Sequence, residues 1–192
     1  MIRIAVLGDI GSGKSHVAKL FGFPVFNADA EVAKLYRKSR KCYSKLKKIL
    51  PNYITSFPVK KIELSKAIMS NQQNLKKIIK VVHPEVRNRM NNFIKKNRNK
   101  KFIVLDIPLL LENKINKKND VLIFVNSRKK DIDKKLKKRN KVSRKILKTL
   151  KKFQLPIEIK KKKSDFIIKN NFKSNSIKKN VKIVKEKILF NA

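Results

Sequence analysis

Five short apolar stretches stand out along the chain, at residues 1–7, 24–26, 102–105, 121–125 and 166–168. A continuous apolar run, as opposed to an alternating one, is typical of a parallel strand that is buried on both faces. The segments between these runs carry apolar residues at helical spacing, and residues 176–189 have the pattern of an amphipathic closing helix. This alternation predicts an α/β fold in which helices flank a five-stranded, doubly wound parallel sheet.

The chain is predicted to form one domain with three parts. No linker rich in Pro, Ser or Gly divides its 192 residues, and this length suits a single core. The sheet and its flanking helices are expected in residues 1–30, 100–127 and 164–192. The mostly helical stretch 31–99 is long enough to cover a substrate, and the lysine-rich segment 128–162 is a candidate lid.

A glycine-rich loop lies between the first predicted strand and the first predicted helix. It contains three of the four glycines of the chain and fits the phosphate-binding pattern G-x-x-x-x-G-K-[ST]. Glycine permits positive φ angles and lets backbone N–H groups close around a phosphate, and the following helix adds its N-terminal dipole. The loop therefore predicts binding of a nucleoside triphosphate. The candidate phosphate-binding residues are Gly8, Asp9, Ile10, Gly11, Ser12, Gly13, Lys14, Ser15 and His16.

Chemical roles can be assigned to four polar residues near the predicted phosphate site. Lys14 is expected to contact the β- and γ-phosphates, and the hydroxyl of Ser15 to bind Mg²⁺. Ligands of parallel sheets bind beyond the carboxyl ends of the strands, where Asp29 and Asp106 follow the second and third predicted strands. Asp29 either accepts a proton from a substrate hydroxyl or caps a helix that begins near Ala30. Asp106 either holds Mg²⁺ through water or caps a loop.

Two further features contain candidate phosphate ligands. The segment His83-Pro84-Glu85-Val86-Arg87 is predicted to begin a helix, because proline suits the first helical turn. His83 and Arg87, about one turn apart, either serve one anionic ligand or leave the histidine a structural role. Arg139 is one of few arginines among many lysines, which indicates a need for a planar, multidentate phosphate donor.

The net charge of +39 results from 52 Lys and Arg residues against 13 Asp and Glu residues. Such a balance is typical of nucleic-acid-binding proteins. The lysines are spread along the whole chain, however, and lysine, asparagine and isoleucine share A/T-rich codons. We interpret the charge as a solvated basic surface that attracts polyphosphates, with no specific nucleic acid as a partner.

The expected location is the cytoplasm, with no membrane association. No apolar run is long enough to span a bilayer, the N-terminus lacks the features of a signal peptide, and Cys42 is the single cysteine. The protein is expected to be a monomer or a small homo-oligomer.

Taken in order, the motifs of the chain resemble those of the dephospho-CoA kinase family from the glycine-rich loop to about Asn171. Asn27-Ala28-Asp29 resembles the family's D-A-D, the segment 83–87 its H-P-x-V-R, and the segment 106–112 its P-L-L-x-E. Farther along, the similar pairs are Arg139-Asn140 with R-D, residues 154–160 with Q-x-P-x-x-x-K, and residues 164–170 with A-D-x-x-I-x-N.

This resemblance implies a P-loop kinase of the nucleoside-monophosphate-kinase type with a lid. It would use ATP with Mg²⁺ to phosphorylate the ribose 3′-hydroxyl of dephospho-CoA. By position, Asp29 would be the catalytic base, Lys14 and Arg139 would act on the transferring phosphates, and Asn170 would lie near the adenine of ATP. The acceptor would be bound by His83, Arg87, Pro108, Leu109 and Glu112.

The chain departs from the family pattern at several positions. Asp9 and Phe172 stand where glycine is usual or common, and Asn27 replaces the first aspartate of D-A-D. Lys61, Lys135 and Leu150 stand where arginines are usual. Two other function classes stay open at this point: a different small-molecule P-loop kinase, such as one acting on nucleoside monophosphates, and an ATP-dependent nucleic-acid-binding protein.

Overall fold

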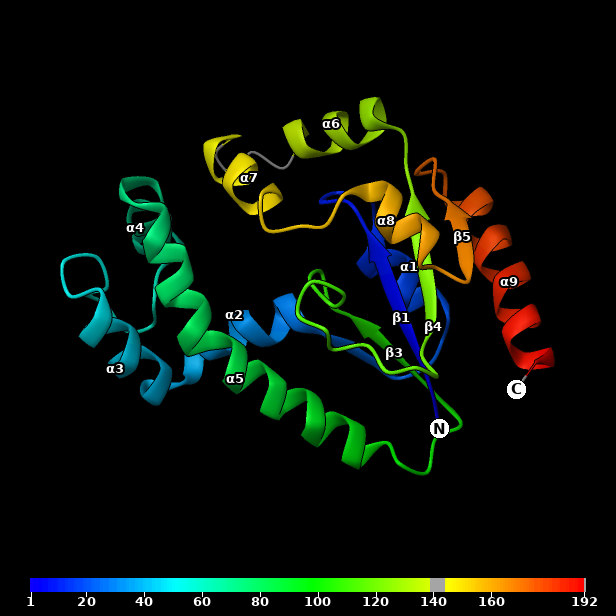
Figure 1. The fold of residues 1–192 in the computed structure, drawn as a ribbon, viewed down its shortest axis with the longest axis horizontal. Coiled ribbons are helices and arrows are strands. Elements are labelled where there is room, and N and C mark those ends of the chain that lie inside the picture. The colour runs from blue at the N-terminus through cyan, green and yellow to red at the C-terminus, as the bar shows by residue number, and fades with distance from the viewer. Residues whose placement is uncertain (139–143, 192) are drawn as a thin grey trace. The chain divides into compact units, whose positions relative to one another are not determined.

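A five-stranded sheet lies at the centre of the fold, and all of its strands are parallel (Figure 1). The computed structural model of the chain describes residues 1–138 and 144–191. The strand order is β2-β3-β1-β4-β5. The strands are β1 (Ile2–Gly8), β2 (Val25–Asn27), β3 (Phe102–Asp106), β4 (Val121–Asn126) and β5 (Phe166–Lys169). All five lie at the apolar runs of the sequence, so the predicted parallel α/β sheet is confirmed.

The described chain forms two compact units. The first contains the sheet and comprises residues 1–27, 96–138 and 151–191; the second comprises residues 28–95 and 144–150. The helices are α1 (Lys14–Leu20), α2 (Ala28–Lys38), α3 (Arg40–Ile49), α4 (Lys61–Ser70), α5 (Gln72–Lys96), α6 (Lys129–Lys138), α7 (Arg144–Lys151), α8 (Ile157–Lys162) and α9 (Ser174–Phe190).

The core of the first unit lies between the sheet and the helices α1 and α9. β1, β3 and β4 contribute buried side chains at almost every position, which explains why their sequences are continuously apolar. α9 lies beside β5 (Figure 1) and buries one stripe of side chains at intervals of four, three and four residues. These are Ile177, Val181, Val184 and Ile188. The predicted amphipathic closing helix is therefore confirmed.

The strand register brings polar chain segments to one edge of the sheet. Gly8 is paired with Val125 across β1 and β4, and Asn27 is paired with Asp106 across β2 and β3. Because all strands are parallel, their carboxyl ends meet at this edge, where ligands of such sheets bind. The glycine-rich loop begins here.

A buried ion pair connects the beginning of β1 to the loop before β4. An Nη atom of Arg3 lies 2.6 Å from a carboxylate oxygen of Asp120, and both side chains are almost fully buried. Arg3 also donates to the carbonyl of Ile115, and Asp120 accepts the backbone N–H of Lys117. These additional hydrogen bonds help to offset the free energy that is lost when the two charges are removed from water.

The second unit has a core of its own, formed by α2 to α5. Its innermost side chains include Cys42, Leu46, Ile54 and Ala67, which are fully buried. The four helices thus form a separate hydrophobic cluster on residues 28–95.

One local prediction for this unit is wrong. The helix expected to begin at Pro84 begins at Gln72, and Pro84 lies inside α5. Proline removes one backbone N–H and disfavours helix at the preceding residue, but here the turns before it are anchored by Ile78 and Val82 in the core. Burial of apolar side chains on the N-terminal side of the proline therefore outweighs its local preference.

Glu63 stabilises the second unit in a pH-dependent way. Its buried carboxylate accepts backbone N–H groups of Thr55, Ser56 and Lys60 at 2.9–3.1 Å, together with the hydroxyls of Thr55 and Ser56. Burial alone would raise its pKa, but these hydrogen bonds outweigh burial and lower the pKa from 4.5 to about 2.

We predict that this carboxylate contributes on the order of 3 kcal/mol to the free energy of unfolding at neutral pH. The folded-state pKa lies below the unfolded one, so the contribution is complete above about pH 5 and is lost as the pH falls toward 2. Urea unfolding between pH 7 and pH 3 tests this. Wild type should lose about 2 kcal/mol more than Glu63→Gln over this range. Parallel losses in the two proteins would contradict the prediction.

Candidate active site

The glycine-rich loop follows β1 directly and ends in α1. Gly11 and Gly13 have positive φ angles of 84° and 91°, which are costly for residues with a side chain. Both glycines are also closely approached: a Cβ on Gly11 would lie 3.1 Å from side-chain atoms of Ile132 and Leu136 in α6, and a Cβ on Gly13 would collide with Nδ2 of Asn170. The loop is therefore held between α6 and the segment that follows β5.

Hydrogen bonds fix the loop from within and from outside. Nδ2 of Asn170 and Oγ of Ser127 both donate to the carbonyl of Ser12, at 2.8 and 2.9 Å. The side chain of Lys14 is buried, and its Nζ donates to the carbonyl of Asp9 at 2.7 Å. Asn170 is itself buried and donates its backbone N–H to Asn126. Hydrogen bonds thus connect the predicted loop to Asn170.

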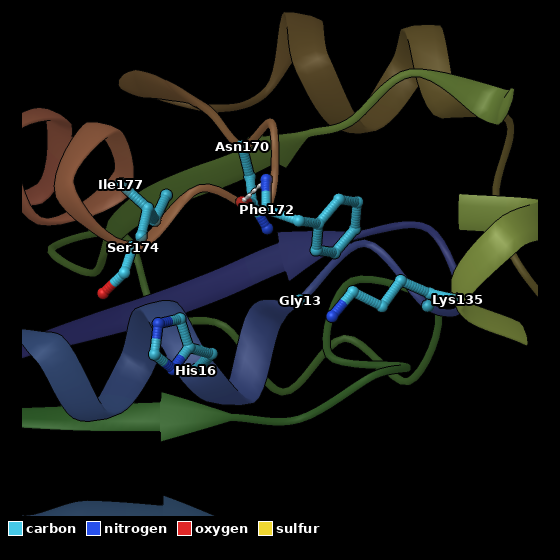
Figure 2. A pocket seen from close by; sticks show the side chains of 8 residues that line it. Gly13, His16, Lys135, Asn170, Phe172, Ser174 and Ile177 are labelled. Carbon is cyan, nitrogen blue, oxygen red and sulfur yellow. Dashed lines mark hydrogen bonds between the residues drawn. The ribbon is translucent and has the colours of Figure 1, made fainter. Parts of the chain in front are cut away.

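A cavity of about 250 Å³ opens beside the loop (Figure 2). Its lining combines apolar surface from Phe172 and Ile177 with polar groups from His16 and Asn170. The ring of Phe172 extends toward Lys135, whose Nζ lies 5.4 Å from the ring centroid. The full lining is Gly11, Gly13, His16, Lys135, Asn170, Phe172, Ser174 and Ile177. An apolar face with a few polar groups is typical of a site for a heteroaromatic ring.

Phe172 has a backbone conformation that is unusual for its residue type. Its φ angle is 63°, and its N–H donates to Oδ1 of Asn170 at 2.9 Å. The Asn170 side chain thus binds the loop through one end and Phe172 through the other. Sequence reasoning did not identify Ser174 and Ile177 as cavity-lining residues. The only available signal was their position just after the motif at 164–170.

Three polar residues converge at the carboxyl edge of β2 and β3. The amide Nδ2 of Asn27 donates to the carboxylate of Asp106 and, at 3.3 Å, to Oγ of Ser15. One amide group therefore connects the two oxygen groups expected to hold Mg²⁺. Hydroxyl and carboxylate oxygens suit this ion, which in phosphoryl-transfer sites takes its other ligands from phosphates and water. The described residues contain no cluster of three or more His, Cys, Asp and Glu side chains that could hold a metal ion.

The segment after β3 contains Pro108, Leu109 and Glu112. Pro108 and Leu109 are half-buried. Oε1 of Glu112 lies 2.7 Å from Nζ of the buried Lys160 and accepts the backbone N–H of Leu155 at 2.9 Å. Oε2 of Glu112 is buried and has no hydrogen-bond partner within the described chain. Glu112 thus connects the segment after β3 to α8 through one oxygen, while its other oxygen makes no hydrogen bond within the described chain.

The remaining predicted site residues belong to the second unit or are not described. Asp29 is exposed in the first turn of α2, which begins at Ala28, so the predicted helix start near Ala30 is two residues late. His83 and Arg87 lie one turn apart on α5. Burial, together with the neighbouring Arg87, lowers the pKa of His83, which favours the neutral imidazole. Arg139 lies outside the described residues.

Comparisons with known proteins show which family this chain is similar to. A family model described as dephospho-CoA kinase matches residues 2–176. A dephospho-CoA kinase from Wolbachia sp. subsp. Brugia malayi (strain TRS) is 34% identical over 184 residues, which cover 93% of this chain and 94% of the relative.

Two solved structures are similar over nearly their whole length. A crystal structure of TT1252 from Thermus thermophilus has a TM-score of 0.76 and 26% identity, covering 99% of this chain and 97% of that one. Dephospho-CoA kinase from Campylobacter jejuni has a TM-score of 0.63 and 22% identity, covering 98% of each chain. The similarity to the second structure shows the fold alone, which is that of a P-loop kinase.

Proposed function

The chain belongs to the dephospho-CoA kinase family, and we propose that it transfers the γ-phosphoryl group of ATP to the ribose 3′-hydroxyl of dephospho-CoA. The products are CoA and ADP, as in the last step of CoA synthesis. The family match over residues 2–176 carries this conclusion, because it includes both the phosphate loop and the segments around it. The match does not favour a different small-molecule kinase or a nucleic-acid-dependent ATPase.

The P-loop would bind the triphosphate with its backbone N–H groups. Lys14, which donates to the carbonyl of Asp9 in this structure, would contact the β- and γ-phosphates. Ser15 and, through water, Asp106 would hold Mg²⁺, which neutralises charge on the phosphates when it is bound. We further propose that the adenine enters the cavity beside Phe172 and Asn170.

Asp29 would act as the general base. In the reaction, the 3′-oxygen of the acceptor forms a bond to the γ-phosphorus, the bond from that phosphorus to the β,γ-bridging oxygen breaks, and ADP leaves. The carboxylate of Asp29 accepts the hydroxyl proton. Support comes from chain continuity: Asp29 follows Asn27 by two residues, so their Cα atoms are at most about 7 Å apart. Asn27 itself bonds Ser15 and Asp106.

The acceptor site would combine residues from two chain segments. Pro108 and Leu109 offer half-buried apolar surface, and Oε2 of Glu112 offers a buried acceptor for a hydroxyl or amide group. His83 and Arg87 would bind acidic groups of the acceptor, with Arg87 as the permanently charged member. We assign Arg139 to the transferring phosphates on its motif alone.

Location and assembly complete the proposal: we propose a cytoplasmic monomer or small homo-oligomer. None of the described helices is both long and apolar enough to cross a membrane. The even spread of lysines along the chain supports the proposal that the protein has no specific nucleic-acid partner.

An acceptor-comparison assay tests the proposed function. ATP turnover is measured with dephospho-CoA, AMP, shikimate or poly-RNA present at equal concentration and constant ionic strength. We expect turnover to increase only with dephospho-CoA, with CoA formed in the same amount as ADP. Stimulation by AMP or RNA in place of dephospho-CoA would favour the corresponding alternative and contradict the proposal.

A further inference from the structure

The phosphate loop contains an acidic residue, Asp9, whose carboxylate is hydrogen-bonded within the loop. Oδ1 of Asp9 accepts the backbone N–H of Ile10 at 2.6 Å, and the side chain is only 16% exposed. A carboxylate at this position repels a bound polyphosphate, because two negative charges then face each other in a partly desolvated site. The loop therefore requires a positive charge close to Asp9.

That positive charge is supplied from a distant part of the chain. Nζ of Lys151, at the end of α7, lies 3.5 Å from Oδ2 of Asp9. Lys14 contacts the same residue at its backbone carbonyl, which its Nζ approaches to 2.7 Å. The two lysines thus have different roles at Asp9: one contacts the backbone, and the other contacts the side-chain charge.

We infer that Lys151 is a positioning residue that neutralises Asp9 and so strengthens the binding of ATP to a P-loop that contains a carboxylate. The inference rests on the proposed ATP-binding function of this loop. An exposed ion pair of this length contributes little to folding stability, and the Lys151 side chain is 48% exposed. The contribution of the pair lies in the charge that an incoming anion meets, which is a property of binding and not of the fold.

The alternative is that Lys151 contacts the phosphates directly and that its effect on ATP binding does not depend on Asp9. The two possibilities differ in one respect. A residue that compensates Asp9 becomes dispensable once the carboxylate is removed, whereas a direct phosphate ligand does not.

A double-mutant cycle separates these possibilities. The affinity for ATP with Mg²⁺ is measured by calorimetry at about 0.1 M salt, where screening is moderate, for wild type, Asp9→Asn, Lys151→Gln and the double variant. Asparagine keeps the acceptor for the Ile10 N–H, so the loop conformation is preserved. Lys152→Gln, at the exposed neighbouring lysine, controls for the loss of one charge from a very basic chain. Thermal melting of each variant confirms that it is folded.

We expect Lys151→Gln to weaken ATP binding about fivefold in the wild-type background and less than about twofold in the Asp9→Asn background. Lys152→Gln should bind ATP like wild type, and the KM for dephospho-CoA should be unchanged throughout. An equal loss in both backgrounds would overturn the inference in favour of direct phosphate contact. No loss in either would show that the pair has no function. If wild type itself fails to bind ATP, the proposed function is what fails.

Discussion

Replacing Asp29 with asparagine is expected to lower kcat about 10²–10⁴-fold, while the affinity for ATP stays within about twofold of wild type. The amide keeps the size of the side chain but cannot accept the proton of the acceptor hydroxyl. Asp29 is exposed in the first turn of α2. Steady-state CoA formation and calorimetric ATP binding are the two measurements required.

Two controls accompany this prediction. Glu158→Gln removes another exposed carboxylate from the first turn of a helix, α8, and should leave kcat unchanged. Lys14→Ala should impair ATP binding and turnover together, because Lys14 contacts the nucleotide in the ground state as well. Undiminished turnover in Asp29→Asn would exclude Asp29 as the base.

Replacing Gly13 with alanine is expected to weaken ATP binding by at least about tenfold. The new Cβ would collide with Nδ2 of Asn170, the atom that binds the carbonyl of Ser12. Asn170 cannot move aside easily, because it is buried and is also bonded to Asn126 and Phe172. The substitution therefore distorts the phosphate loop and the cavity at once. Calorimetry with ATP and Mg²⁺ measures the effect.

Gly22→Ala is the matched control for this substitution. Gly22 also has a positive φ, 73°, but a Cβ there would meet only the flexible end of Lys185 at 3.6 Å. Alanine at position 22 therefore meets a similar backbone strain but no steric clash. Gly22→Ala should lower the melting temperature slightly and leave ATP binding intact. If Gly13→Ala binds ATP as well as Gly22→Ala does, the contact with Asn170 is not required for the site.

The sheet could be predicted from the sequence because burial on both faces leaves a strong local signal. Each strand lies at a continuous apolar run, and the glycine-rich loop follows the first of them. Local signals failed where tertiary packing decides the outcome. Pro84 indicates a helix start, yet α5 passes through it because Ile78 and Val82 are buried in the core before it.

The sequence predicted many residues of the candidate site, but it did not predict which of them contact one another. Gly13 and Lys14 are recognisable from their spacing alone. The bond from Asn170 to Ser12 joins residues 158 positions apart, and the pair of Asp9 with Lys151 also joins segments that are far apart in the sequence. Such contacts depend on how distant segments pack in the tertiary structure, and a local sequence pattern does not predict that packing. The same holds for Glu112, whose partner Lys160 belongs to a different motif.

The strand order also has a consequence for synthesis of the chain. β1 is made first, but both of its neighbours come late: Ile2 pairs with Phe102, and Gly8 pairs with Val125. As the chain leaves the ribosome, the buried residues of β1 have no neighbouring strand to pair with until β3, at residues 102–106, has been made. Residues 28–95, which form most of the second unit, emerge in the meantime and can collapse on their own core. The phosphate loop is translated before the strands that flank β1, so it acquires its shape only after those later strands have been made.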